Sequence, residues 1–207
     1  MDVLQYFITF LIPLLIIMDP IGNLPLFLLF TEQNTPKEQR RIAAISSGTA
    51  GMILTFFALT GDFVLRLFRI SLPAFQLAGG FVFFVYALQM LGLIPGGIKT
   101  TTQEEEEGIS KENVALVPLA TPLLAGPGAI TAVLVWQQSP DSVEKIPLLL
   151  TAITTACFLV YGIFYFGKWI RRIAGVGGIR VVTRLMGLLL AVIAVQFMVE
   201  GVRQILK

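Results

Sequence analysis

Long apolar runs and short polar stretches alternate along the chain, and the runs predict its architecture. A helix needs about 20 apolar residues to cross the hydrocarbon core of a membrane. Six segments are long enough, at roughly 3–31, 42–65, 72–94, 114–137, 146–167 and 181–205. The pattern therefore predicts an all-α membrane protein with six transmembrane helices.

Two of these segments, the first and the fourth, are interrupted in the middle by proline, glycine and short polar residues. The first break covers residues 19–25 and the second covers residues 121–128. Inside a bilayer no water can satisfy the backbone groups that a break frees, so a break persists only where protein buries it or where it lines a polar cavity. Paired breaks in the two halves of a chain point to a transporter binding site.

Composition supports the membrane assignment and narrows the chemistry. Hydrophobic residues make up 56% and charged residues 14% of 207 residues, and the mean hydropathy is +0.82. Soluble domains carry about 25% charged residues. The net charge of +2 gives no reason to expect a nucleic-acid partner. The chain has no histidine, a single cysteine and no glycine-rich phosphate loop, so we expect no metal site, no cofactor and no ATP drive.

The N-terminal segment does not resemble a cleavable signal peptide. Residues 1–5 include Asp2 and no lysine or arginine, and the apolar run after them exceeds the apolar region of a signal. We therefore expect the first segment to remain in the mature protein.

The distribution of lysine and arginine predicts the orientation in the inner (plasma) membrane. The connections between segments 1 and 2, 3 and 4, and 5 and 6 carry ten of these residues, and the opposite side carries five. The positive-inside rule places the richer side in the cytoplasm, so both termini should lie outside. Three segments per half then make the halves inverted repeats: residues 1–94, a polar cytoplasmic loop at 95–113, and residues 114–207.

Internal similarity supports an inverted 3 + 3 repeat with broken first and fourth helices. Residues 19–20 match residues 121–122 at an offset of 102. Three residues of the third segment recur in the sixth at an offset of 107: Gly80 as Gly187, Ala87 as Ala194 and Gln89 as Gln196.

The first break has the composition of a site built on the end of a half-helix. Asp19 before Pro20 should end one half-helix, because the residue before proline avoids the helical region. Asn23 is a good cap for the next half-helix. Gly22 lets a ligand approach the backbone. The free N–H groups of such a helix start suit a carboxylate.

The second break repeats this design. Thr121-Pro122 should close the earlier piece, and Gly126-Pro127-Gly128 should start a new half-helix with its proline as a natural first residue. Thr131 offers a further hydroxyl nearby. With inverted halves, the two helix starts would converge near the midplane.

Asp19 is the only acidic residue well inside a predicted span, which makes it a functional hypothesis. It could bind a substrate ammonium, coordinate sodium or carry a proton. The alternative is a structural role, in which its carboxylate caps backbone N–H groups at the break.

Residues 18–27 (MDPIGNLPLF) and 118–131 (PLATPLLAGPGAIT) resemble signature segments of the MarC family of bacterial and archaeal inner-membrane proteins, and residues 184–196 also look like that family. The resemblance covers essentially the whole chain. It implies a six-helix protein related to the SnatA-type neutral amino acid transporters, with the site at the two broken helices.

Together these features predict a secondary transporter for small neutral amino acids, of glycine or alanine size, with proton or sodium coupling as a possibility. Backbone N–H groups near Asn23 and Gly128 would hold the carboxylate. Asp19, Thr121 or unwound carbonyls would hold the ammonium or a coupling ion. The alternative is a channel or exporter-like pore for ions or small metabolites. An intramembrane enzyme is disfavoured, because one isolated deep carboxylate without histidine offers no acid–base pair.

Overall fold

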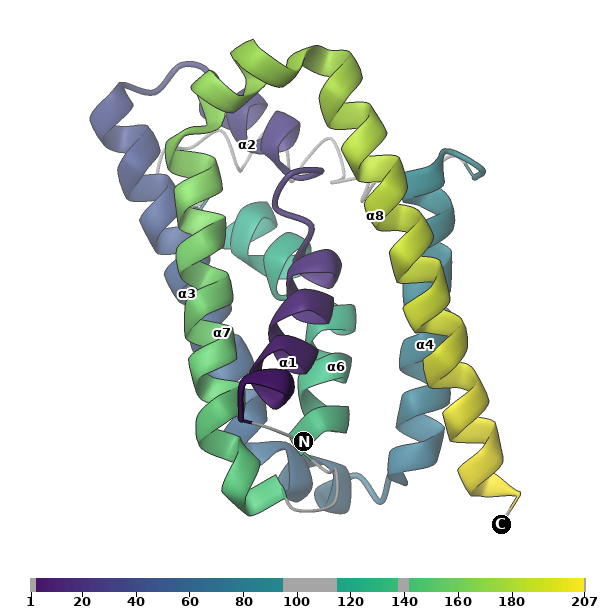
Figure 1. Ribbon diagram of the computed structural model, residues 1–207. Helices are drawn as coiled ribbons and strands as arrows, with labels where there is room; N and C mark the ends of the chain where they lie inside the picture. The colour runs from purple at the N-terminus through teal and green to yellow at the C-terminus, as the bar shows by residue number, and fades with distance from the viewer. Residues whose placement is uncertain (1–2, 95–114, 138–141, 207) are drawn as a thin grey trace.

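The computed structural model describes residues 3–94, 115–137 and 142–206, which form helices with no β-strand among them (Figure 1). This confirms the predicted all-α class. The predicted polar loop, residues 95–113, lies outside the described residues. The helices are α1 (Val3–Met18), α2 (Leu24–Phe30), α3 (Pro36–Leu67), α4 (Leu72–Leu91), the π-helix η1 (Ala115–Leu124), α6 (Pro127–Gln137), α7 (Ser142–Tyr165) and α8 (Gly167–Ile205).

Within the described part of the chain, four helices are long and apolar enough to cross a membrane: Pro36–Gly61, Leu72–Leu91, Ile146–Tyr165 and Gly167–Ile205. They account for four of the six predicted spans. Each of the other two predicted spans is split into two pieces, α1 with α2 and η1 with α6. That these pairs cross the bilayer as broken spans stays a prediction.

Local signals in the sequence set the ends of the long helices. At the start of α3, the Thr35 side chain accepts from the N–H of Glu38, whose carboxylate accepts in turn from the N–H of Thr35. At the start of α4 the Ser71 hydroxyl accepts from the N–H of Ala74, and Gly92 ends that helix with a φ of 74°, which glycine adopts without steric cost. Gly175, with a φ of 64°, kinks α8, whose first turns cross one end of the bundle (Figure 1).

The helices pack as two pairs with the broken segments between them. α3 packs along α7, and α4 packs along α8 (Figure 1). α1 and α6 lie between the pairs: α1 contacts α7 and α8, while α6 contacts α3 and α4. The first break is therefore buried inside the bundle, whereas Pro127 at the second break is exposed.

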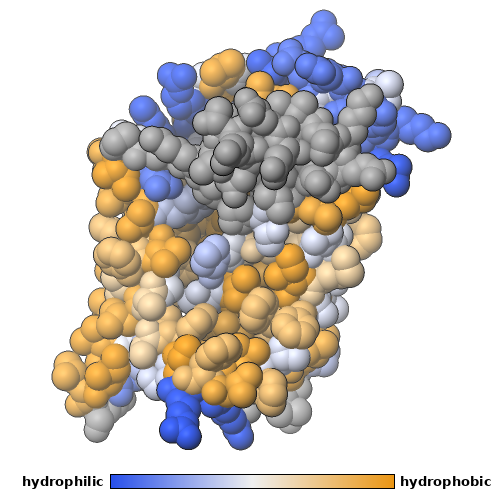
Figure 2. Space-filling view, turned by 180° about the vertical axis from the view of Figure 1, so that it is seen from behind, coloured by the Kyte–Doolittle hydropathy of each residue, from blue (hydrophilic) through white to orange (hydrophobic). Residues whose placement is uncertain are grey.

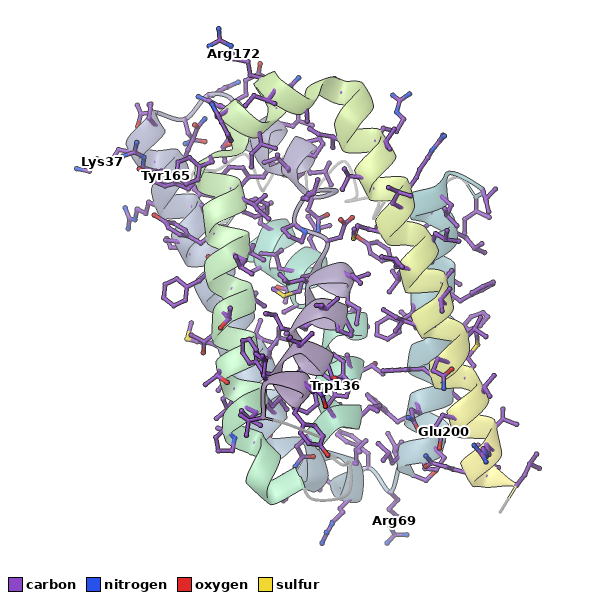
Figure 3. The ribbon with its side chains drawn as sticks, viewed as in Figure 1. Lys37, Arg69, Trp136, Tyr165, Arg172 and Glu200 are labelled. Atoms are coloured by element: carbon purple, nitrogen blue, oxygen red, sulfur yellow. The ribbon has the colours of Figure 1, made fainter. Side chains whose placement is uncertain are left out.

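Polar residues gather at the two ends of the bundle and apolar residues cover the band between them (Figure 2). Lys37, Tyr165 and Arg172 lie at one end, while Arg69 and Glu200 lie at the other (Figure 3). The start of α1 and the end of α8 share the second of these ends (Figure 1). Large side chains in the band face outward, as expected of a surface in contact with lipid.

Glycines bring α4 and α8 into backbone contact, and the contacts are reciprocal. A Cβ added to Gly80 would lie 2.8 Å from the carbonyl oxygen of Ala194, and one added to Gly187 would lie 3.3 Å from that of Ala87. Each glycine also lies close to a backbone nitrogen one turn farther along the partner helix, Met198 for Gly80 and Leu91 for Gly187. Every one of these contacts maps onto its counterpart by the offset of 107 residues found in the sequence. Small residues at such positions allow close helix packing in membranes.

This close packing predicts that Gly80→Ala destabilises the protein. The new methyl group would overlap a backbone carbonyl, which cannot rotate away, and overpacking of this kind costs about 1–3 kcal/mol. The control is Gly162→Ala on α7, where no atom lies within 4 Å of the added Cβ. There the higher helix propensity of alanine should stabilise by up to about 1 kcal/mol. Thermal unfolding in detergent measures both changes, and equal behaviour of the two variants would contradict the packing account.

Candidate functional site

At the first break, Asp19 turns the chain and satisfies part of its backbone. α1 ends at Met18, as the Asp19-Pro20 pair predicts. Asp19 is 3% exposed and has a φ of 41°, a left-handed conformation that Asp tolerates better than most residues. Its Oδ1 accepts from the N–H of Gly22 at 3.0 Å. The structure therefore contains the capping contact that was the structural alternative for Asp19. Pro20 is buried beside it.

The position of the Asp19 side chain requires a glycine at residue 22. A Cβ on Gly22 would overlap the carboxylate of Asp19, whose Cγ lies 2.6 Å from the added atom. The space that we expected to admit a ligand at Gly22 is thus taken by the Asp19 side chain.

Asn23 joins the two sides of the break, and the prediction that it caps α2 is wrong. Its backbone is right-handed, with φ −80° and ψ −12°, and its side chain makes no capping hydrogen bond. The backbone therefore lacks the extended conformation that a capping side chain requires. Instead Nδ2 donates to the carbonyl oxygen of Met18 at 2.9 Å. This bond satisfies a carbonyl that the end of α1 leaves without an intrahelical partner.

At the second break, the helix continues farther than predicted. η1 runs through Thr121-Pro122 to Leu124, so the prediction that this pair closes the earlier piece is wrong. The cause is a change of helix type: the N–H of Ala125 donates to the carbonyl of Ala120, five residues back, at 2.8 Å. The wider π-helical turn accommodates Pro122, which has no N–H to donate. Such π-helical turns often occur at functional sites.

The new half-helix does begin at Pro127, as predicted. The two threonines predicted as site residues turn their hydroxyls to their own helices. Thr121 donates to Leu116 at 3.1 Å, and Thr131 donates to Pro127 at 2.8 Å. Thr131 packs against Gly79 of α4. The side chain of Pro122 lies outside the described residues.

A cavity of about 450 Å³ opens beside the start of α6. Gly126, Pro127 and Gly128 form one wall, and Tyr86 and Gln89 of α4 form another. Gly128 also packs closely against the ring of Phe83, since an added Cβ would lie 2.5 Å from Cε1. Neither Thr121 nor Thr131 is among the described residues of this wall.

Tyr86 connects the cavity with the first break. Its side chain hydrogen-bonds with that of Asn23 and lies close enough to Asp19 for an electrostatic interaction. The structure thus brings Asp19, Gly22 and Asn23 together, and Tyr86 both interacts with this cluster and lines the cavity beside the second break. Sequence reasoning missed Tyr86 because it sits in a phenylalanine-rich run. A signal was available, because Gly79, Phe83 and Tyr86 share one helix face at spacings of four and three residues.

Acidic and sulfur ligands are not gathered around this cavity. Across residues 3–94, 115–137 and 142–206, no group of three or more histidine, cysteine, aspartate or glutamate side chains could hold a metal ion. The polar groups in or beside this cavity are Tyr86, Gln89, the Asp19–Asn23 pair and the backbone at the start of α6.

Comparison with known proteins assigns the family. The model of the MarC family of integral membrane proteins matches residues 4–206, so the chain belongs to the MarC family. It is 37% identical over 204 residues to a UPF0056 membrane protein of Aquifex aeolicus, covering 97% of this chain and 94% of that protein. It is 33% identical over 199 residues to the UPF0056 membrane protein YhcE of Escherichia coli, covering 96% and 93%. It is 38% identical over 200 residues to a UPF0056 membrane protein of Methanocaldococcus jannaschii, covering 97% of both. No solved structure matches the chain significantly.

The hydrogen bond from Asn23 to the Met18 carbonyl across the first break predicts that Asn23→Ala destabilises the protein. The substitution leaves the buried Met18 carbonyl without its donor, which costs about 1–3 kcal/mol. Asn34→Ala, in the connection before α3, is the control and should change stability by less than about 0.5 kcal/mol. Thermal unfolding in detergent compares the two, and an Asn23→Ala protein as stable as the control would refute the role of this bond.

Proposed function

We propose that this integral membrane protein is a secondary transporter for small neutral amino acids, related to SnatA-type transporters, that works by alternating access. The observation that carries the proposal is that Tyr86 interacts with the first break and also lines a partly open cavity beside the second break. Discontinuous helices at the middle of a bundle are the form that substrate sites take in many transporters.

The start of α6 is the proposed carboxylate site. An α-helix leaves its first N–H groups without intrahelical partners, and its N-terminus carries a partial positive charge. Pro127 is the first residue of α6, and Gly128 and Ala129 come next along the cavity wall. The N–H groups of Gly128 and Ala129 would receive the substrate carboxylate.

The carboxylate of Asp19 at the first break is the proposed ammonium site. Asp19 uses Oδ1 for the N–H of Gly22, and a carboxylate keeps further acceptor capacity when one bond is made. Tyr86 lines the cavity and interacts with Asp19, so its hydroxyl can bond to either end of a small zwitterion. The cavity is near the small end of the usual range for ligand pockets, roughly 300–1,000 Å³. Leu123, Leu124 and Phe83 make the rest of its wall apolar, which suits a short apolar side chain.

The reciprocal contacts between α4 and α8 support the inverted repeat that alternating access requires. If a two-fold axis relates two helices, each contact between them has a counterpart in which the two residues are exchanged. The Gly80 and Gly187 contacts are related in this way by the offset of 107 residues. We propose that residues 1–94 and 114–207 are the repeats, joined by a cytoplasmic loop at 95–113. With the end that carries Lys37 and Arg172 in the cytoplasm, both termini lie outside the inner membrane.

Counterflow in proteoliposomes tests this function. Vesicles preloaded with unlabelled L-alanine should take up labelled L-alanine or glycine in a saturable way, with D-alanine a weaker substrate. Flux that is neither saturable nor stereoselective would favour the pore instead. Proton and sodium gradients, applied one at a time, identify the coupling ion.

Tyr86→Phe should weaken substrate binding by about tenfold or more, because a hydrogen bond to a charged group contributes about 1.5–3 kcal/mol. The ring stays, so packing of α4 is retained. Tyr161→Phe is the matched control, since Tyr161 lies on α7 outside this cavity. Substrate-dependent stabilisation and counterflow, measured on both variants, give the affinity; equal affinities would remove Tyr86 from the site.

Asp19→Asn separates the roles of the carboxylate. Asparagine keeps an oxygen for the Gly22 N–H, so the break should remain folded. We expect both binding and exchange to fall, because the substrate ammonium loses its counter-charge. Loss of gradient-driven uptake with exchange preserved would instead assign Asp19 to ion coupling. Wild-type behaviour in binding, exchange and uptake would leave Asp19 with the capping role alone.

A further inference from the structure

A second and larger cavity faces outward from the bundle, away from the proposed transport site. It is a groove of about 660 Å³ between α3 and α7. Gly48, Gly51 and Phe56 line it on α3, and Cys157 and Phe158 line it on α7. Phe56 is 56% exposed and Phe158 is 70% exposed, so the groove opens to the surface that lipid covers. Gly48 has no atom within 4 Å of an added Cβ, so its part of the groove is open space.

The groove is long enough for an acyl chain. Its lining on α3 extends from Ala44 to Leu59, which are 15 residues apart. At 1.5 Å per residue this is about 22 Å along the helix. One leaflet contributes half of a hydrocarbon core of about 30 Å. An extended acyl chain therefore fits along the groove from its polar end inward.

A basic pocket lies at the polar end of this groove. Arg40 is one helical turn before Ala44 on α3, and Tyr165 is one turn after Tyr161 on α7; Ala44 and Tyr161 are both in the groove wall. Arg40, Tyr165 and Lys168 line a smaller cavity of about 170 Å³. The Arg40 guanidinium carbon lies 4.6 Å from the centre of the Tyr165 ring, a cation–π contact that fixes its position.

We propose that an anionic phospholipid occupies both cavities. Its phosphate lies between Arg40 and Lys168, and one acyl chain runs along the groove past Gly48 and Gly51. Two cations above a continuous apolar groove match the two chemistries of such a lipid, a charged headgroup and a hydrocarbon chain. Two acids lie near this arrangement: Glu32 shares a neighbouring cavity with Lys168 and Arg171, and Glu38, on α3 two residues before Arg40, bonds to Thr35.

The charges argue against a second copy of the chain as the occupant. Two copies in the same membrane orientation would meet through the same surface on each protomer. Each Arg40 would then approach the other at the same depth in the membrane, together with the two Lys168 side chains. Like charges brought together in this way oppose association.

Binding of the anionic headgroup by Arg40 and Lys168 is tested by native mass spectrometry of delipidated protein titrated with phosphatidylglycerol or phosphatidylcholine. The wild-type protein should retain one phosphatidylglycerol in preference to phosphatidylcholine. Arg40→Gln/Lys168→Gln should weaken phosphatidylglycerol binding by roughly 25-fold, about fivefold for each charge removed. The control, Arg69→Gln/Arg203→Gln, removes two charges at the other end of the bundle and should leave this binding unchanged.

Binding of the acyl chain in the α3–α7 groove is tested by Gly48→Leu, which fills the open space without a clash. It should weaken binding of both lipids, whereas Gly162→Leu on α7, also in open space but outside the groove, should not. The proposal is overturned if phosphatidylcholine binds as tightly as phosphatidylglycerol, or if test and control variants behave alike. It is also overturned if inorganic phosphate alone displaces the lipid, or if a lipid-free dimer forms that Gly48→Leu dissociates.

Discussion

Backbone polar groups inside a bilayer must find partners within the protein, and this constraint controls the two broken helices. The first break meets it with two short bonds, from Asn23 to the Met18 carbonyl and from the Gly22 N–H to Asp19. The second meets it by widening into a π-helix and restarting at Pro127. The helices that carry the breaks pack between the α3–α7 and α4–α8 pairs, which buries Asp19 and Asn23 at the first break, while Pro127 at the second is exposed.

The same constraint places polar chemistry in the interior. Polar groups of the first break lie near Tyr86, whose side chain also lines the cavity beside the second break. The helix that carries Tyr86 packs closely and reciprocally on α8, because Gly80 and Gly187 let the two backbones touch. A rigid helix pair thus holds a polar anchor against two segments that are not continuous helices.

Composition and local rules were enough to predict the long helices and two of the helix ends at the breaks. Apolar length located the long helices, the Asp19-Pro20 pair located the end of α1, and Pro127 located the start of α6. Prediction from sequence failed where tertiary contacts decide. Asn23 has a capping residue's chemistry, but its right-handed backbone directs the amide to Met18. A proline such as Pro122 normally ends a helix, yet η1 continues past it. The role of Tyr86 was not predicted, because its partners, Asp19 and Asn23, are distant in sequence.

The central claim is that the Tyr86 cavity is a substrate site reached alternately from both sides of the membrane. Gln89→Cys in a Cys157→Ser background places a single thiol in its wall. The account predicts labelling by a membrane-impermeant thiol reagent from either side of oriented vesicles, and protection by L-alanine. Cys157 of the wild-type chain, in the α3–α7 groove, should show no such protection. Labelling of the Gln89→Cys thiol that L-alanine leaves unchanged, or access from one side only, would contradict the account.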